Sequence, residues 1–281
     1  MITLAKFLAI SGIILPMLPH KNLIPDINLT PYSIWLATVV VSGISYLSYL
    51  LKRYVFHESG VLVSGIIGGL YSSTATISVL ARKSRKASEQ EANEYVAAML
   101  LAVSMMFLRF MILILIFSRE IFTSIYPYLL IMSVVAAVVA WFIHSRHRRS
   151  KDMADESEDE DSSNPLEFKV ALIFATLFVV FTVLTHYTLV YAGTGGLNLL
   201  SFVSGLSDIT PFILNLLQNT GSVAVLVVVA CSMQAIISNI LVNMFYALFF
   251  AGKGSKLRPW ILGGFGTVIG VNLVLLLFFY L

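Results

Sequence analysis

The stretch GLYSSTATISVL, residues 69–80, returns 136 positions later as GLSDITPFILNL, residues 205–216. Both copies follow the pattern Gly-Leu-x-(Ser/Asp)-x-Thr-x-x-Ile-x-x-Leu. A glycine followed by hydroxyl-bearing residues loosens a helix and frees backbone polar groups that lipid cannot satisfy. Two copies in otherwise apolar surroundings therefore indicate a duplicated site built on broken helices.

The composition assigns the chain to a membrane. Of its 281 residues 58% are hydrophobic and 12% are charged, and the mean hydropathy of +0.89 is far from that of a soluble domain. Most of its apolar runs reach the ~20 residues with which a helix crosses ~30 Å of hydrocarbon. The runs lie at about 3–18, 32–51, 60–81, 94–117, 122–143, 168–190, 192–218, 221–250 and 259–281. We expect an all-α, polytopic helical protein of the cell (plasma or inner) membrane, surrounded by the lipid bilayer.

The remaining composition narrows the function class. No small-residue cleavage site follows the first run, so we interpret residues 1–20 as an extra N-terminal transmembrane helix. The single cysteine, Cys231, lies in an apolar run, which excludes a disulfide framework and a cysteine-based metal centre. The net charge of +3 mainly reports topology. We expect no cofactor and no nucleic-acid partner.

A charged segment divides the chain into two similar halves. Residues 144–165 begin basic and continue with the acidic run DESEDED, which is typical of a solvated linker. The first membrane repeat then covers residues 31–143 and the second covers residues 166–281. Within them, Ser104 and Arg109 parallel Ser238 and Asn243 with the same spacing of five.

The Lys and Arg positions distinguish two topologies. If every run crosses, the basic residues outside the runs divide ten to seven between the two sides. If both motif segments dip in and return to the same face, all of these except Lys21 and Arg119 share one side. The positive-inside rule favours the second arrangement, with the N-terminus and the 144–165 linker in the cytoplasm. Each repeat then has three crossings and one re-entrant segment, so the repeats are inverted. Broken helices that cross fully are the alternative.

The first motif supplies hydroxyl groups. Such side chains, together with freed backbone groups, can replace the hydration shell of an ion or solute. The candidate binding residues are Ser72, Ser73, Thr74 and Thr76. Glycines four apart, such as Gly65 and Gly69, equally predict close helix packing.

The second motif adds a charge and a break. Pro211 cannot donate a backbone hydrogen bond and disfavours helix at Thr210, so we expect the chain to break there. Asp208 lies beside this break, and a carboxylate in an apolar run normally faces a cavity or a partner. The alternative is that Asp208 only caps the helix that starts near Pro211.

The fourth and eighth runs contribute further polar residues. Arg109 lies near the middle of its run, too deep to reach water easily, and Asp208 is the natural partner for its charge. A purely structural ion pair would use the same residues. Asn239 and Asn243 share one helix face, which indicates either a lining of the site or hydrogen bonds between helices.

No catalytic arrangement accompanies these residues. The chain has no His-Glu-x-x-His motif, and no lysine follows the glycines as a phosphate-binding loop requires. We therefore do not expect an enzyme, and the sequence does not identify a metal site.

The two motifs resemble a known group. GGLYSSTATISVLARKSRK (68–86) and SGLSDITPFILNL (204–216), with SMMFLR (104–109) and SNILVN (238–243), are similar to the membrane domain found C-terminal to MgtC/SapB-type domains. That family is named as putative magnesium transporters, so the resemblance implies magnesium and an MgtC-type partner. Mg²⁺ usually needs carboxylates and retained waters, and Asp208 is the one deep acid. A monovalent cation, a proton-coupled solute or a small zwitterion fits the residues equally well.

These observations predict a transporter or channel for a small ion or solute. Its site would form near the midplane from the two motifs. The alternative is a non-transporting regulatory or scaffold membrane protein. Such a protein would use its glycine faces to bind an MgtC-type domain, a pump or a second copy of itself.

Overall fold

The computed structural model describes residues 11–280 except 26, 56–59, 86, 88, 146–167, 219–222 and 253–254. Within this part the regular secondary structure is helical, apart from an isolated β-bridge between Ile24 and Ile27. The elements are α2 (Pro31–Leu50), η1 (Leu51–Val55), α3 (Val61–Lys83), α4 (Glu89–Phe117), α5 (Arg119–Ser145), α6 (Phe168–Ser204), α7 (Ile209–Gln218), α8 (Val225–Ala251) and α9 (Arg258–Tyr280).

Seven of these helices are long and apolar enough to cross a membrane: α2, α3, α4, α5, α6, α8 and α9. The prediction of an all-α, multi-pass membrane protein is therefore confirmed. Of the expected N-terminal helix, residues 11–17 are helical and residues 1–10 lie outside the described part. The linker is outside it as well, except His144 and Ser145, which end α5.

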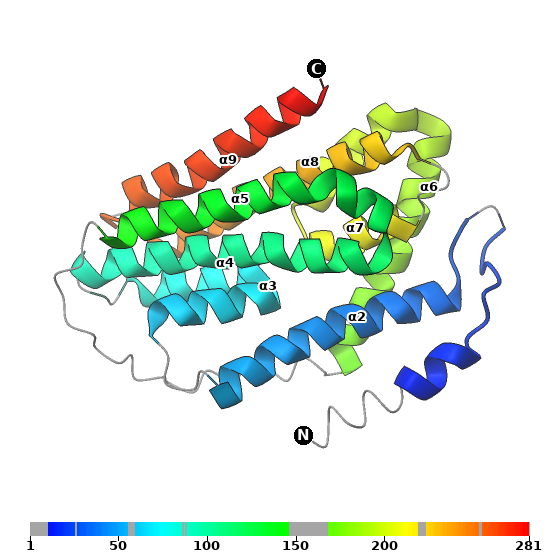
Figure 1. Ribbon diagram of the computed structural model, residues 1–281, viewed down its shortest axis with the longest axis horizontal. Coiled ribbons are helices and arrows are strands. Elements are labelled where there is room, and N and C mark those ends of the chain that lie inside the picture. The colour runs from blue at the N-terminus through cyan, green and yellow to red at the C-terminus, as the bar shows by residue number, and fades with distance from the viewer. Residues whose placement is uncertain are drawn as a thin grey trace.

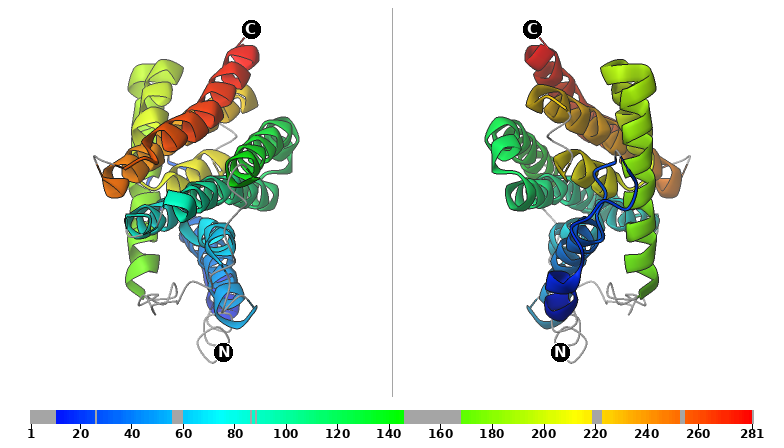
Figure 2. Two further views of the ribbon diagram at one scale, coloured as in Figure 1. Left: turned by 90° about the vertical axis from the view of Figure 1, so that its left-hand side faces the viewer. Right: turned by 90° about the vertical axis from the view of Figure 1, so that its right-hand side faces the viewer.

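The helices form a bundle around two central members. Figure 1 shows α4, α5, α8 and α9 as long, side-by-side rods with α2 along one edge, and Figures 1 and 2 show α6 crossing them steeply. The most apolar windows of α4 and α8 are 56% and 67% buried, more than those of the other spans. The short α7 lies between α4 and α8. Residues 209–217 of α7 are all buried.

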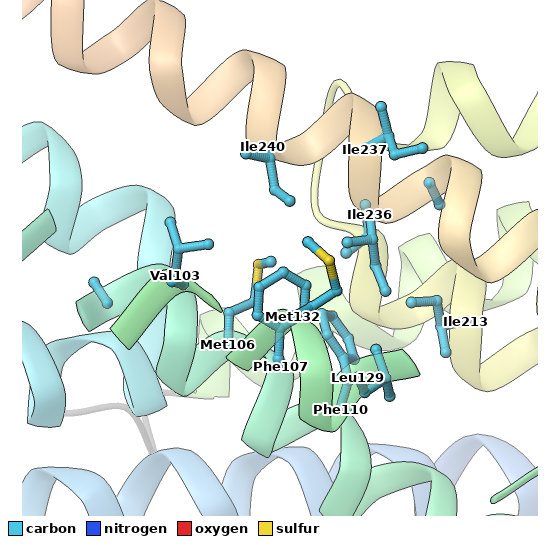
Figure 3. Close-up of a cluster of buried hydrophobic side chains, with 14 of the residues drawn as sticks. Val103, Met106, Phe107, Phe110, Leu129, Met132, Ile213, Ile236, Ile237 and Ile240 are labelled. Carbon is cyan, nitrogen blue, oxygen red and sulfur yellow. The ribbon is translucent and has the colours of Figure 1, made fainter. Parts of the chain in front are cut away.

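An apolar cluster joins the two halves of the chain. Figure 3 shows Met106 and Phe110 of α4 beside Met132 of α5, facing Ile213 of α7 and Ile240 of α8. All five side chains are buried. The candidate site described below therefore rests on side chains from both halves.

Local sequence explains where the first described span begins. Thr30 and Ser33 form a reciprocal capping box, in which each backbone N–H donates to the other's hydroxyl oxygen, at 3.0 and 3.1 Å. Pro31 occupies the first helical position, where its missing N–H is not needed. The helix therefore starts at Pro31, at the edge of the predicted apolar run.

Glycines allow α3 to approach α4 at the distance of backbone contact. A Cβ atom on Gly69 would lie 2.5 Å from Ala102 Cα, and one on Gly65 would collide with the Ala98 carbonyl. The predicted close packing thus takes place inside the chain. These two glycines are covered by α4, so they do not form the partner-binding face that the scaffold alternative requires.

We expect Gly69→Ala to destabilise the protein, because the added methyl group meets backbone that cannot move aside. The expected loss is about 1–3 kcal/mol, measured by thermal or denaturant unfolding in detergent micelles. Gly43→Ala in α2 is the matched control, since nothing lies within 4 Å of its Cβ position. A Gly69→Ala protein as stable as Gly43→Ala would contradict the close α3–α4 contact.

Candidate functional site

The first motif contains a break in α3. Ser72 has φ −158° and ψ 108°, which separates the helical residues 61–71 from residues 73–83. The Ser72 hydroxyl oxygen accepts the Ala75 N–H at 3.4 Å, as a cap of the second half does. A Cβ atom on Gly68 would touch Thr76, although eight residues of unbroken helix span about 12 Å. The two halves therefore fold back on each other at Ser72.

The second motif contains a break between α6 and α7. The Asp208 carboxylate accepts the Thr210 N–H at 2.9 Å, one residue before α7 begins at Ile209. The break covers residues 205–208, so the expectation of a break at Thr210 was wrong by a few residues. Pro211 lies in the first turn of α7, where its N–H has no helical partner to lose. Asp208 caps this helix, as the alternative for this residue predicted.

A third break divides α6. Gly193 has φ 59° and ψ −153°, a left-handed conformation that glycine adopts without strain. It lies at the boundary between two of the predicted apolar runs. Residues 194–204 follow it as a separate helical half that leads into the second motif.

Each motif segment packs against the long helix that follows it in the same register. In the first half of the chain, Gly69 meets Ala102. In the second half, Gly205 meets Ser238, and Ser201 donates to Gln234 Oε1 at 2.8 Å. Every one of these pairs is 33 residues apart. Ser238 thus corresponds to Ala102, two positions from the predicted counterpart Ser104.

Polar side chains of α4 and α8 satisfy the carbonyls that the breaks release. Arg109 Nη1 donates to the Tyr71 carbonyl at 2.7 Å, at the end of the first half of α3. Asn239 Nδ2 donates to the carbonyls of Gly205 and Ser207 at 3.3 and 3.4 Å. Buried carbonyls without such partners would be costly. Both residues therefore hold a broken segment in place.

The two breaks line one cavity of about 390 Å³. Its walls come from α2, α3, α4, α6, the α6–α7 link and α8. Seven of the nine predicted binding residues line it: Ser72, Ser73, Thr74, Arg109, Asp208, Thr210 and Asn239.

The other two predicted residues lie behind the lining. Thr76 packs against the position of Gly68. Asn243 is buried and donates to Asn239 Oδ1 at 3.2 Å, which orients the amide that holds the second break. Their placement favours supporting roles over direct contact with a ligand.

Arg109 and Asp208 share the cavity but do not pair directly. Arg109 bonds the Tyr71 carbonyl, whereas Asp208 Oδ1 accepts from the Thr210 backbone. Among the described residues no ion pair joins the two. The two charges therefore attract each other within one cavity but do not form a direct ion pair.

Sequence reasoning missed part of the lining. Ser42 and Ser45 of α2 line the cavity, as do Tyr71 and Ser207 at the same position of the two motifs. The two serines could have been found because they lie three positions apart in an apolar run, which places both on one face of a helix. The signal for Tyr71 and Ser207 was the equivalence of the two copies.

Comparison with known proteins places the chain in a family. The family model described as "Domain of unknown function (DUF4010)" matches residues 39–251, which include both motifs and the whole cavity lining. The chain belongs to this family. It is also similar to an uncharacterized protein of Aquifex aeolicus (strain VF5), with 27% identity over 221 residues, 78% of this chain and 94% of the relative.

No solved structure matches the chain. The comparisons do not link it to MgtC/SapB-type domains or to a magnesium transporter family. The family model therefore establishes membership of the DUF4010 family, and the magnesium assignment and the MgtC-type partner have no support from these comparisons.

We expect Asn239→Ala to destabilise the protein by about 1–3 kcal/mol, because it leaves the Gly205 and Ser207 carbonyls without their donor. Thermal unfolding in detergent measures the loss. Asn272→Leu in α9 is the control, since its buried Oδ1 has no partner among the described residues and its removal should be nearly neutral. Equal melting temperatures of the two variants would contradict the role assigned to Asn239.

Proposed function

We propose that the chain is a membrane transporter or channel for a small ion or solute, and that the cavity between the two broken segments is its site. The observation that carries this proposal is that both motifs line one cavity together with Arg109 and Asp208. Charged residues within a membrane are expensive and usually mark a pathway or a binding site. Discontinuous helices that meet at a substrate site are a recurring design of secondary transporters.

The shared packing register supports an internal repeat. In both halves a broken segment lies parallel to the next long helix, with partners 33 residues apart. In both halves a side chain from that long helix also bonds the carbonyls of the break. These parallels favour two units of the same design, which we propose to be inverted in the membrane.

The course of α3 supports a re-entrant segment. Its first half runs along α4 from Ala98 towards Ala102, away from the start of α4. Its second half folds back and ends at Lys83, six residues before Glu89, where α4 begins. Both ends of α3 thus lie near the same end of α4, as a segment that returns to one membrane face requires.

Basic residues gather at this end of the bundle. Arg82 lies 4.3 Å from the Phe250 ring, and Arg85 donates to the Phe249 carbonyl at 3.1 Å. The end of α3 and the end of α8 are therefore close, and Lys256 and Arg258 follow shortly after α8. The positive-inside rule makes this end cytoplasmic, and we propose the cell membrane as the location.

The scaffold alternative remains a second candidate. An MgtC-type domain, a pump or a second copy would have to bind a surface other than Gly65 and Gly69, which α4 covers. Access of water to the cavity distinguishes the two proposals, because the binding site of a transporter must be reached by water whereas a scaffold has no such requirement.

We expect cysteines placed in the cavity to react with a membrane-impermeant methanethiosulfonate from at least one face of sealed vesicles. Thr74→Cys and Ser207→Cys are suitable, in a Cys231→Ser background. The cysteine thiolate attacks the reagent and displaces methanesulfinate, and thiolate forms in water and not in lipid.

Ala97→Cys is the matched control for this labelling, since Ala97 is fully buried in α4 and should stay unlabelled. Labelling of Thr74→Cys and Ser207→Cys supports a water-filled site. If neither reacts from either face in folded protein, the proposed function is wrong.

We expect cysteines at Gly60 and Ala87, at the two ends of α3, to be labelled from the same side of the membrane. Inversion places Gly221 on the opposite side, although this residue lies outside the described part. Gly60→Cys is well tolerated sterically, since nothing lies within 4 Å of its Cβ position. Labelling of Gly60 and Ala87 from opposite faces would show that α3 crosses the membrane.

A further inference from the structure

Two opposite charges face the same cavity without touching each other. Arg109 reaches the cavity from the middle of α4, and Asp208 reaches it from the link between α6 and α7. A charge inside a membrane protein normally has a counter-charge, because an isolated one is costly. Here each charge bonds the backbone, and the two attract each other across the cavity without a direct ion pair among the described residues.

The guanidinium of Arg109 is only partly used. Its Nη1 bonds the Tyr71 carbonyl, whereas Nε and Nη2 meet no acceptor among the described residues. Guanidinium groups bind carboxylates with two parallel hydrogen bonds. The second half of α3, which begins at Ser73, adds an N-terminal turn beside the same cavity, and such a turn favours a negative group.

The carboxylate of Asp208 is also only partly used. Oδ1 accepts the Thr210 N–H, and Oδ2 has no donor among the described residues. Asp208 is the one carboxylate in the cavity lining, and the side chain is exposed to the space around it. An ammonium group beside Asp208 would give this charge its missing partner.

The balance of charge selects among ligands. A simple cation would neutralise Asp208 and leave Arg109 unpaired, and a simple anion would do the reverse. A molecule with both charges neutralises both residues at once. A divalent cation is disfavoured for a second reason: divalent cations prefer several carboxylates, and the cavity lining has one.

Part of the wall is apolar. Ile173, Phe174 and Leu177 of α6 face the cavity, together with Met106 and Phe110 of α4. A volume of about 390 Å³ is at the lower end of the range for small-molecule sites, roughly 300–1,000 Å³. The ligand that fits this lining is small and carries an apolar group in addition to its charges.

We propose that the cavity binds a small zwitterion of the amino-acid type with an apolar substituent. Its carboxylate lies at Arg109 and the second half of α3, its ammonium group at Asp208, and its substituent against α6. This inference deepens the proposed function and rests on it for the access of the cavity to water.

The test measures binding to the full-length protein in nanodiscs at neutral pH, by isothermal titration calorimetry and by thermal shift. The probes are glycine, L-alanine, L-valine and L-leucine. L-leucine is compared with 4-methylpentanoate, which lacks the ammonium group, and with 3-methylbutylamine, which lacks the carboxylate. We expect at least one amino acid to bind, and both single-charge analogues of leucine to bind about tenfold more weakly or worse than the best amino acid.

Asp208→Asn tests the role of the carboxylate. An asparagine oxygen still accepts the Thr210 N–H, so α7 keeps its cap and the melting temperature without ligand should hold. We expect the affinity for L-leucine to fall to about that for 4-methylpentanoate. Asn272→Leu, which lies outside the cavity lining, should bind all probes as the unmodified chain does.

Each of the following results would overturn the assignment: no response to any of the four amino acids, equal binding of a single-charge analogue, or unchanged leucine binding by a folded Asp208→Asn protein. Binding of potassium, magnesium or phosphate in place of the amino acids would do the same. Labelled cavity cysteines with no amino-acid binding would leave the transport proposal standing without this ligand class. Amino-acid binding without flux into proteoliposomes would support this ligand class and contradict the transport proposal.

Discussion

The structure depends on the need to satisfy the backbone groups that helix breaks release inside a membrane. Lipid offers no hydrogen bonds, so each freed carbonyl must find a donor within the protein. Arg109 supplies it for Tyr71, and Asn239 supplies it for Gly205 and Ser207. Both donors come from α4 and α8, the most buried helices of the bundle. The two central helices therefore fix the positions of the two broken segments.

Glycine packing and hydrogen bonding act together at each break. Gly69 and Gly205 bring their segments into backbone contact with α4 and α8, and only this closeness lets a side chain of the long helix reach the carbonyls beyond them. The motif glycines and the polar side chains of α4 and α8 thus act together to hold each break. The cavity is the space that remains where two such segments end.

Much of this arrangement could be predicted from the repeated motif and the apolar runs. The helical class followed from composition, and the polar residues at the breaks line the cavity because both breaks border it. The details followed less well. Pro211 marked the wrong residue for the break, since a first-turn proline continues a helix that Asp208 has already capped. Arg109 was expected to pair with Asp208, because a sequence shows opposite charges but not the nearer carbonyl of Tyr71.

Arg109 combines two tasks in a single side chain. One nitrogen holds the end of the first half of α3, while the others lie beside the cavity without an acceptor among the described residues. A negative group that attracts the guanidinium weakens the hydrogen bond from Arg109 to the Tyr71 carbonyl. In an empty cavity that hydrogen bond is stronger. Ligand binding in the cavity and the angle between the two halves of α3 are then coupled through the Arg109 side chain.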